Sequence, residues 1–65
     1  MNLIEGLQKE MNRCRELLKE YEAIGWAGQF GAAMIKQEIN TAENRIATGD
    51  TIGMMQSYNS LKECN

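Results

Sequence analysis

The sequence predicts an all-α protein of three helices, in which the first two form an antiparallel hairpin and the third is shorter. Apolar residues recur at intervals of three and four along most of the chain, which is the repeat of a helix with one buried face. The 65 residues include no proline, the residue that most often interrupts a helix. A chain of this length forms one domain, so residues 1–65 are expected to fold as a single helical unit.

The first helix is expected over residues 2–24. Six apolar residues there are spaced by alternating steps of three and four: Ile4, Leu7, Met11, Cys14, Leu18 and Tyr21. This is the heptad pattern of a helix that packs along one seam. Asn2 is a residue type that caps helix starts, and Gly25 is one that ends helices.

The second helix is expected over residues 30–48 and the third over residues 51–62. The apolar stripe of the second helix has smaller residues than the first, which lets another helix approach closely: Ala32, Ile35, Ile39, Ala42 and Ile46. Gly49 suits the end of that helix, and Asp50 suits the capping position of the next one.

Helix lengths predict a homo-oligomeric bundle. The first helix comes to roughly 34 Å, while its partners come to roughly 27 Å and 18 Å, so a single chain is expected to leave apolar surface uncovered. Self-association would cover it, with an expected interface at Ile4, Leu7, Met11, Leu18, Tyr21, Met54 and Met55. The methionines are equally consistent with ordinary core packing.

The segment between the first two helices holds a candidate ligand-binding site. No Ser, Thr, Asp or Asn lies between Gly25 and Gly31, so the first N–H groups of the second helix lack a capping side chain. Such groups, with the helix dipole, form a site for phosphate or carboxylate. Trp26 and Phe30 offer rings that stack on a base, and Lys36 offers an ammonium group for a phosphate. The expected ligand-binding residues are Gly25, Trp26, Gly28, Phe30, Gly31 and Lys36.

A purely structural interpretation explains the same residues. A glycine-rich turn is common between antiparallel helices, and Trp26 and Phe30 would then close the end of the bundle. The glycine spacing matches neither the P-loop pattern nor the dinucleotide-binding fingerprint. Both interpretations stay open at this point.

Composition argues against several classes of function. The chain has no histidine and no paired acid, Ser/His or Cys/His arrangement, so we expect no enzyme, no metal site and no cofactor. A net charge of −2 with interspersed signs argues against binding of duplex nucleic acid. Cys14 and Cys64 have neither metal-ligand nor redox-motif spacing, and no secretory signal or membrane-spanning stretch is evident. We therefore expect a cytoplasmic protein with reduced thiols.

The run Gly28–Lys36, followed by the segment Ala47–Asp50 and by Tyr58, Leu61 and Lys62, resembles short helical proteins of bacteriophages and prophages. The resemblance implies a phage protein acting in the host-cell cytoplasm by binding a host component. Some phage proteins of this size bind nucleotide alarm signals of bacterial defence, and others block a host protein. We therefore expect a non-enzymatic inhibitor that sequesters a nucleotide-like anion; the alternative is a protein–protein inhibitor or adaptor acting through an exposed helix face.

Overall fold

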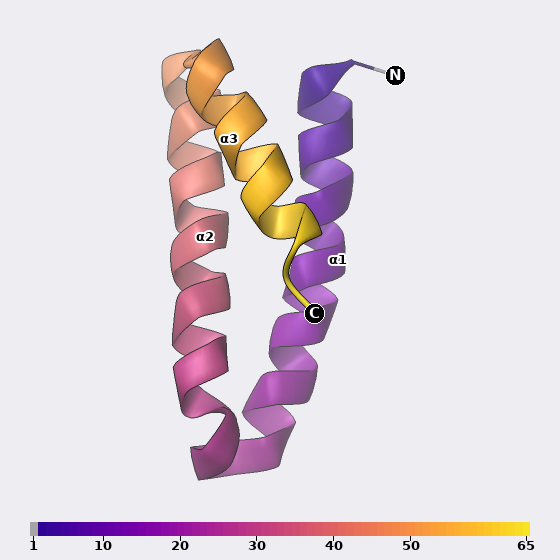
Figure 1. Cartoon of the computed structure of the whole chain (residues 1–65), viewed down its shortest axis with the longest axis vertical. Coiled ribbons are helices and arrows are strands. Elements are labelled where there is room, and N and C mark those ends of the chain that lie inside the picture. Colours follow the sequence, from indigo (N-terminus) through magenta and orange to yellow (C-terminus); the bar gives the residue numbers. More distant parts are fainter. Residues whose placement is uncertain (1) are drawn as a thin grey trace.

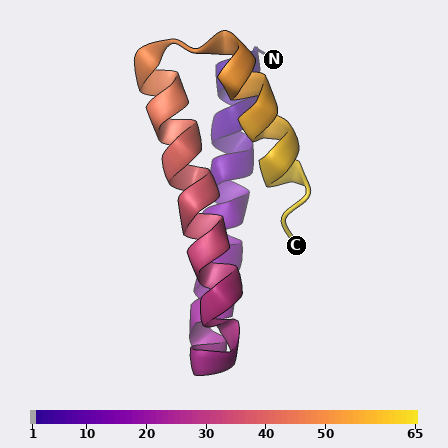
Figure 2. The same cartoon turned by 60° about the vertical axis from the view of Figure 1, so that its left-hand side comes forward.

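The computed structural model describes residues 2–65, and all regular secondary structure among them is helical, as predicted. Helix α1 spans Leu3–Ile24, the short 3₁₀ helix η1 spans Gly25–Gly28, α2 spans Gln29–Thr48 and α3 spans Thr51–Lys62. Helices α1 and α2 run in opposite directions and are joined at one end by η1, while α3 runs back over both from the other end (Figures 1 and 2). The described chain measures 35 × 20 × 16 Å.

The connection between α1 and α2 differs from the expected glycine-rich loop. Helical residues continue without interruption from Leu3 to Thr48, so the chain has two unbroken helical segments and not three separate ones. The first segment folds back at Gly25, whose φ of 83° and ψ of −136° lie outside the helical region. Glycine adopts this backbone conformation without a steric penalty, so a single residue redirects the chain and helical bonding resumes at once.

Local caps define three further helix ends at the positions that the sequence predicts. The Glu5 N–H donates to Asn2 Oδ1 over 2.8 Å at the start of α1. The Gly53 N–H donates to Asp50 Oδ1 over 2.9 Å at the start of α3. Gly49 ends α2 in the left-handed conformation with a φ of 70°. These three capping predictions are confirmed, because short polar side chains and glycine satisfy helix ends locally.

The core lies where the three helices meet. Its buried hydrophobic cluster consists of Leu7, Met11, Cys14, Ile35, Ile39, Ala42, Met54 and Leu61. The middle of the heptad stripe of α1, at Leu7, Met11 and Cys14, is therefore covered by α2 and α3 of the same chain. Small residues on α2 let the helices approach, and α3 folds over the seam between them.

The expected oligomer interface is corrected by this packing. Leu7, Met11 and Met54 are 0%, 3% and 4% exposed and belong to the core of the single chain, so they offer no surface to a second copy. Leu18 and Tyr21 are partly buried and pack against the same core. The remaining members of the expected set, Ile4 and Met55, are exposed.

Candidate ligand-binding site at the hairpin end

An open cavity of about 500 Å³ lies at the hairpin end, beside the junction of α1, η1 and α2. It is lined by Glu22, Gly25, Trp26, Gln29, Ala32, Ala33 and Lys36. The structure thus brings together three of the residues that the sequence nominates, namely Gly25, Trp26 and Lys36. Gly28, Phe30 and Gly31 do not line this cavity.

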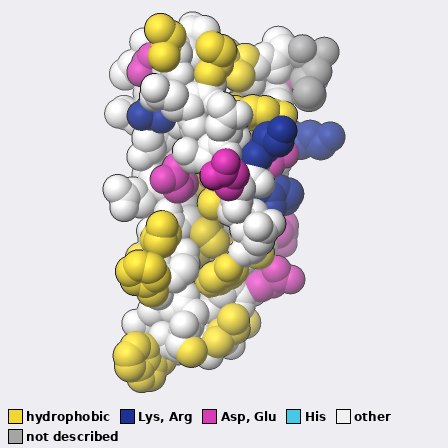
Figure 3. Space-filling model, in the orientation of Figure 1, with side chains coloured by type: hydrophobic (Ala, Val, Ile, Leu, Met, Phe, Trp, Pro, Cys, Tyr) yellow, Lys and Arg dark blue, Asp and Glu magenta, His cyan; other side chains and the backbone are white. Residues whose placement is uncertain are grey.

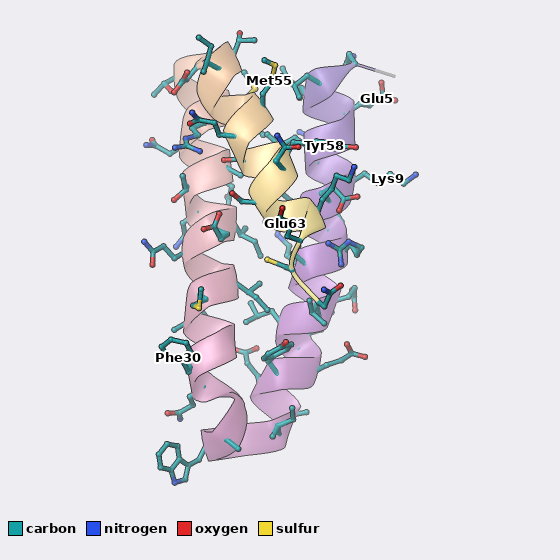
Figure 4. The ribbon with its side chains drawn as sticks, viewed as in Figure 1. Glu5, Lys9, Phe30, Met55, Tyr58 and Glu63 are labelled. Carbon is teal, nitrogen blue, oxygen red and sulfur yellow. The ribbon has the colours of Figure 1, made fainter. Side chains whose placement is uncertain are left out.

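The two aromatic residues of this region face solvent. Trp26 is 84% exposed and Phe30 is 78% exposed, so neither ring closes the end of the bundle. Phe30 projects outward from α2 on the side away from α1 (Figure 4). Met34 is also exposed, and with Trp26 and Phe30 it forms a run of apolar residues at helical spacings of four, here called the hairpin stripe. Hydrophobic side chains gather over this end of the molecule in Figure 3.

Two of the glycines serve packing between helices. A Cβ atom at Gly28 would overlap the backbone carbonyl of Tyr21, and one at Gly31 would overlap the Tyr21 ring. The space beside both glycines is therefore filled by α1, which corrects the expectation that a ligand approaches the backbone there. Gly25 differs, because nothing lies within 4 Å of the position that its Cβ would take.

The backbone at the start of α2 is also less open than expected. As the sequence predicts, no side chain caps the start of α2, because the capping position is occupied by Gly28. However, the helical backbone continues upstream into η1, and the Gln29 N–H donates to the Trp26 carbonyl. The start of α2 is therefore not the free first turn that we expected, and recognition of an anion here depends on side chains.

Lys36 is the cation of the cavity, and it already has a partner. Its Nζ lies 3.3 Å from Glu22 Oε2, with the two side chains 56% and 48% exposed. An ion pair with this exposure contributes only about 0–1 kcal/mol, because water and salt screen it. The ion pair thus holds the ammonium group near the cavity, and a competing anion can replace Glu22 at little cost in free energy.

Glu22 and Gln29 are cavity residues that the sequence analysis missed. Glu22 is in the last turn of α1, and Lys36 is the eighth residue of α2. Their pairing depends on how the chain turns at Gly25, so no local spacing reveals it. Gln29 is the first residue of α2, whereas the sequence places it in the segment before the second helix, where nothing marks its amide as a ligand-binding group.

Other kinds of site are not evident in the described part of the chain. Within residues 2–65, no group of three or more Cys, Asp or Glu side chains is placed to hold a metal ion. None of the helices in this range is both long and apolar enough to cross a bilayer.

In comparisons with protein-family models, curated proteins and solved structures, nothing matches the chain.

Proposed function

We propose that the chain is a small, non-enzymatic binding protein that sequesters a nucleotide-like anion in the cavity at the hairpin end. One observation carries this proposal: an indole, an amide and an ammonium group surround the same open cavity, from Trp26, Gln29 and Lys36. An exposed indole stacks on a base, and an ammonium group pairs with a phosphate. The cavity of about 500 Å³ also lies within the range of roughly 300–1,000 Å³ typical of small-molecule sites.

The Lys36–Glu22 pair gives the proposal a specific electrostatic consequence. A bound phosphate would have to take Lys36 from Glu22 and would then lie near the carboxylate, which repels it. Because the pair is exposed, the exchange costs little. Lys36 is therefore expected to favour binding and Glu22 to oppose it.

The biological role that we propose follows from the resemblance to bacteriophage proteins. A phage protein that removes a nucleotide signal from the cytoplasm of its host would act as an inhibitor of a host defence component. Sequestration needs no catalytic group, which agrees with the absence of histidine from the sequence.

The fluorescence of Trp26 provides the test, because it is the sole tryptophan of the chain. Mononucleotides, dinucleotides and cyclic nucleotides are added to protein freed of retained ligand, and fluorescence and melting temperature are recorded. A binding nucleotide should change the fluorescence and raise the melting temperature in proportion to its excess over Kd. No response across the whole screen would refute the nucleotide site.

Two charge-removing variants locate the binding. Lys36→Gln should weaken binding by about tenfold, as expected for a lost charge-assisted hydrogen bond. Glu22→Gln should tighten binding by about two- to fivefold. Lys9→Gln and Glu5→Gln make the same charge changes near the other end of α1 (Figure 4) and serve as matched controls. Equal effects of site and control variants would show that only net charge matters.

A protein partner is the second candidate, and the hairpin stripe favours it. Trp26, Phe30 and Met34 are 84%, 78% and 54% exposed, and several large exposed apolar residues on one helical segment favour an interaction surface. Phe30→Ser separates the two candidates, because Phe30 belongs to the stripe and not to the cavity. The change should abolish binding of a protein partner while leaving nucleotide binding unaltered.

We further propose that the protein is a homo-oligomer that associates through the opposite end. Ile4, Ile52 and Met55 are exposed there, and two of them belong to the interface that the sequence predicts. Light scattering should report a mass that is a multiple of 7.4 kDa. A monomer across micromolar concentrations would contradict this part of the proposal.

A further inference from the structure

The C-terminal segment of the chain is bound to the side of α1 (Figure 1). The Arg13 guanidinium donates one hydrogen bond to the Leu61 carbonyl over 2.6 Å and another to the Cys64 carbonyl over 3.0 Å. The Tyr21 hydroxyl donates to the Asn65 carbonyl. These contacts place the end of α3 and the residues after it against the middle of the first helix.

This docking brings the two cysteines together although they are far apart in sequence. Cys14 Sγ donates to the Leu61 carbonyl oxygen over 3.5 Å, and the Cys64 N–H donates to the same oxygen over 3.1 Å. The Cys64 side chain packs against the core cluster that contains Cys14. Burial raises the pKa of the Cys14 thiol to about 11, and interaction with the neighbouring Cys64 thiol adds to the rise. Both cysteines are free in the structure.

We propose that Cys14 and Cys64 are an oxidisable pair that closes into an intrachain disulfide and fastens the C-terminal segment to α1. Cys14 is fully buried, whereas Cys64 is only partly buried, so an oxidant reaches Cys64 first. The pair does not depend on the proposed nucleotide site, since neither cysteine lines that cavity.

With a peroxide as the oxidant, the chemistry takes two steps. The Cys64 thiol loses its proton, the thiolate attacks one peroxide oxygen and the O–O bond breaks; Cys64 becomes a sulfenic acid, and the departing hydroxide takes up a proton as water. The Cys14 sulfur then attacks the Cys64 sulfur, the S–O bond breaks, and the departing hydroxide takes the Cys14 proton as water. Two thiols are oxidised to one disulfide, and one hydrogen peroxide is reduced to two waters.

The disulfide would join two residues that lie 50 positions apart in the sequence. It would also fix one wall of a second cavity of about 360 Å³, which is lined in part by Tyr21, Met34, Cys64 and Asn65. A cross-link between distant residues stabilises a protein chiefly by restricting its unfolded chain. Oxidation is therefore expected to stabilise the folded protein without rearranging it.

The test is to treat the full chain with hydrogen peroxide and measure intact mass, peptide connectivity and melting temperature. The wild type should lose two hydrogens in mass, keep the mobility of a single chain on a non-reducing gel, and melt about 10 °C higher. Dithiothreitol should reverse all three changes. Cys64→Ser, which alters only the partly buried position, should show none of them.

Three results would overturn the proposal: Cys64 oxidised further with Cys14 still a free thiol, chains joined to each other through Cys64, or thiols that remain unchanged. Arg13 offers a test of the geometry. Arg13→Gln removes the two guanidinium hydrogen bonds to the Leu61 and Cys64 carbonyls and should slow disulfide formation several-fold. Arg15→Gln is the matched control, because Arg15 contacts Asn12 and Glu43 instead. Equal rates in both variants would contradict the proposed role of the docking.

Discussion

The Arg45 guanidinium donates a hydrogen bond to the Ser57 hydroxyl over 2.9 Å and thereby joins α2 to α3. Ser57 is fully buried, and the same guanidinium donates to the Gly53 carbonyl over 3.1 Å. A Cβ atom at Gly53 would overlap the Asp50 carboxylate and crowd the Arg45 side chain. The absence of a side chain at Gly53 therefore leaves room for Arg45 to bond both the Gly53 carbonyl, in the first turn of α3, and the Ser57 hydroxyl in the middle of that helix.

Removal of the arginine should be more costly than removal of the serine. Arg45→Ala leaves the buried Ser57 hydroxyl without this donor and should lower the free energy of unfolding by about 1–3 kcal/mol. Ser57→Ala removes the hydroxyl itself and should cost about 1 kcal/mol. Urea denaturation measures both values. Equal stability of the Arg45 variant and the wild type would show that the hydrogen bonds contribute nothing.

Alanine substitutions at two glycines should differ in severity. Gly28→Ala places a methyl group against the Tyr21 backbone, which cannot move independently of α1, and should cost about 3 kcal/mol. Gly31→Ala places a methyl group against the Tyr21 ring, which can rotate, and should cost about 1 kcal/mol. Thermal melts of the two variants provide the comparison. Replacing Tyr21 by Ala should remove the penalty at position 31 and leave the penalty at position 28 in place.

Alkaline pH should weaken the fold through Cys14. Burial raises the pKa of this thiol from 9.0 to about 11. The unfolded chain therefore loses this proton first as the pH rises, and the contribution to stability is complete below pH 9 and is lost as the pH approaches 11. A rise of this size corresponds to about 2–3 kcal/mol. Denaturation of the reduced protein at a series of pH values should show a decline that is shallower in Cys14→Ala. Parallel curves would exclude Cys14 as the source.

Charged substitutions should separate core methionines from surface ones. Met11→Lys buries an unpaired ammonium group in the core and should unfold the protein. Met55→Lys adds a charge to a side chain that is 48% exposed and should leave the fold intact. If the homo-oligomer forms through this end, Met55→Lys should also lower the mass measured by light scattering. Circular dichroism together with light scattering distinguishes loss of fold from loss of association.

Local signals predict the helices and their caps but not the way in which the helices cover one another. Asn2, Gly49 and Asp50 act within one helical turn, so their residue types are sufficient to place the caps. The coverage of the α1 stripe depends on α3 folding back over α1 and α2, and helix lengths alone do not reveal it. The predicted oligomer interface therefore included Met11 and Met54, which the chain buries by itself.

The sequence predicts only those residues of the candidate site that lie close together along the chain. Trp26 and Lys36 were found because an aromatic ring and a lysine beside glycines are visible in one short segment. Glu22 was missed because it approaches Lys36 only after the chain has turned at Gly25. The spacing of Cys14 and Cys64 does not predict their proximity either, since it depends on the docking of the C-terminal segment by Arg13.

The non-helical dihedral angles of Gly25 interrupt what is otherwise a continuous run of helical residues through α1, η1 and α2. If Gly25 adopted helical dihedral angles, residues 3–48 would form one helix of about 69 Å, roughly twice the longest dimension of the folded chain, which is 35 Å. The apolar face that α2 now covers on α1 would then be satisfied by the α2 segment of another molecule, which is the exchange known as domain swapping. Gly25→Ala disfavours the positive φ and so shifts the balance toward that extended form. The positive φ of Gly25 is thus what lets these two helices fold back and pair within one chain.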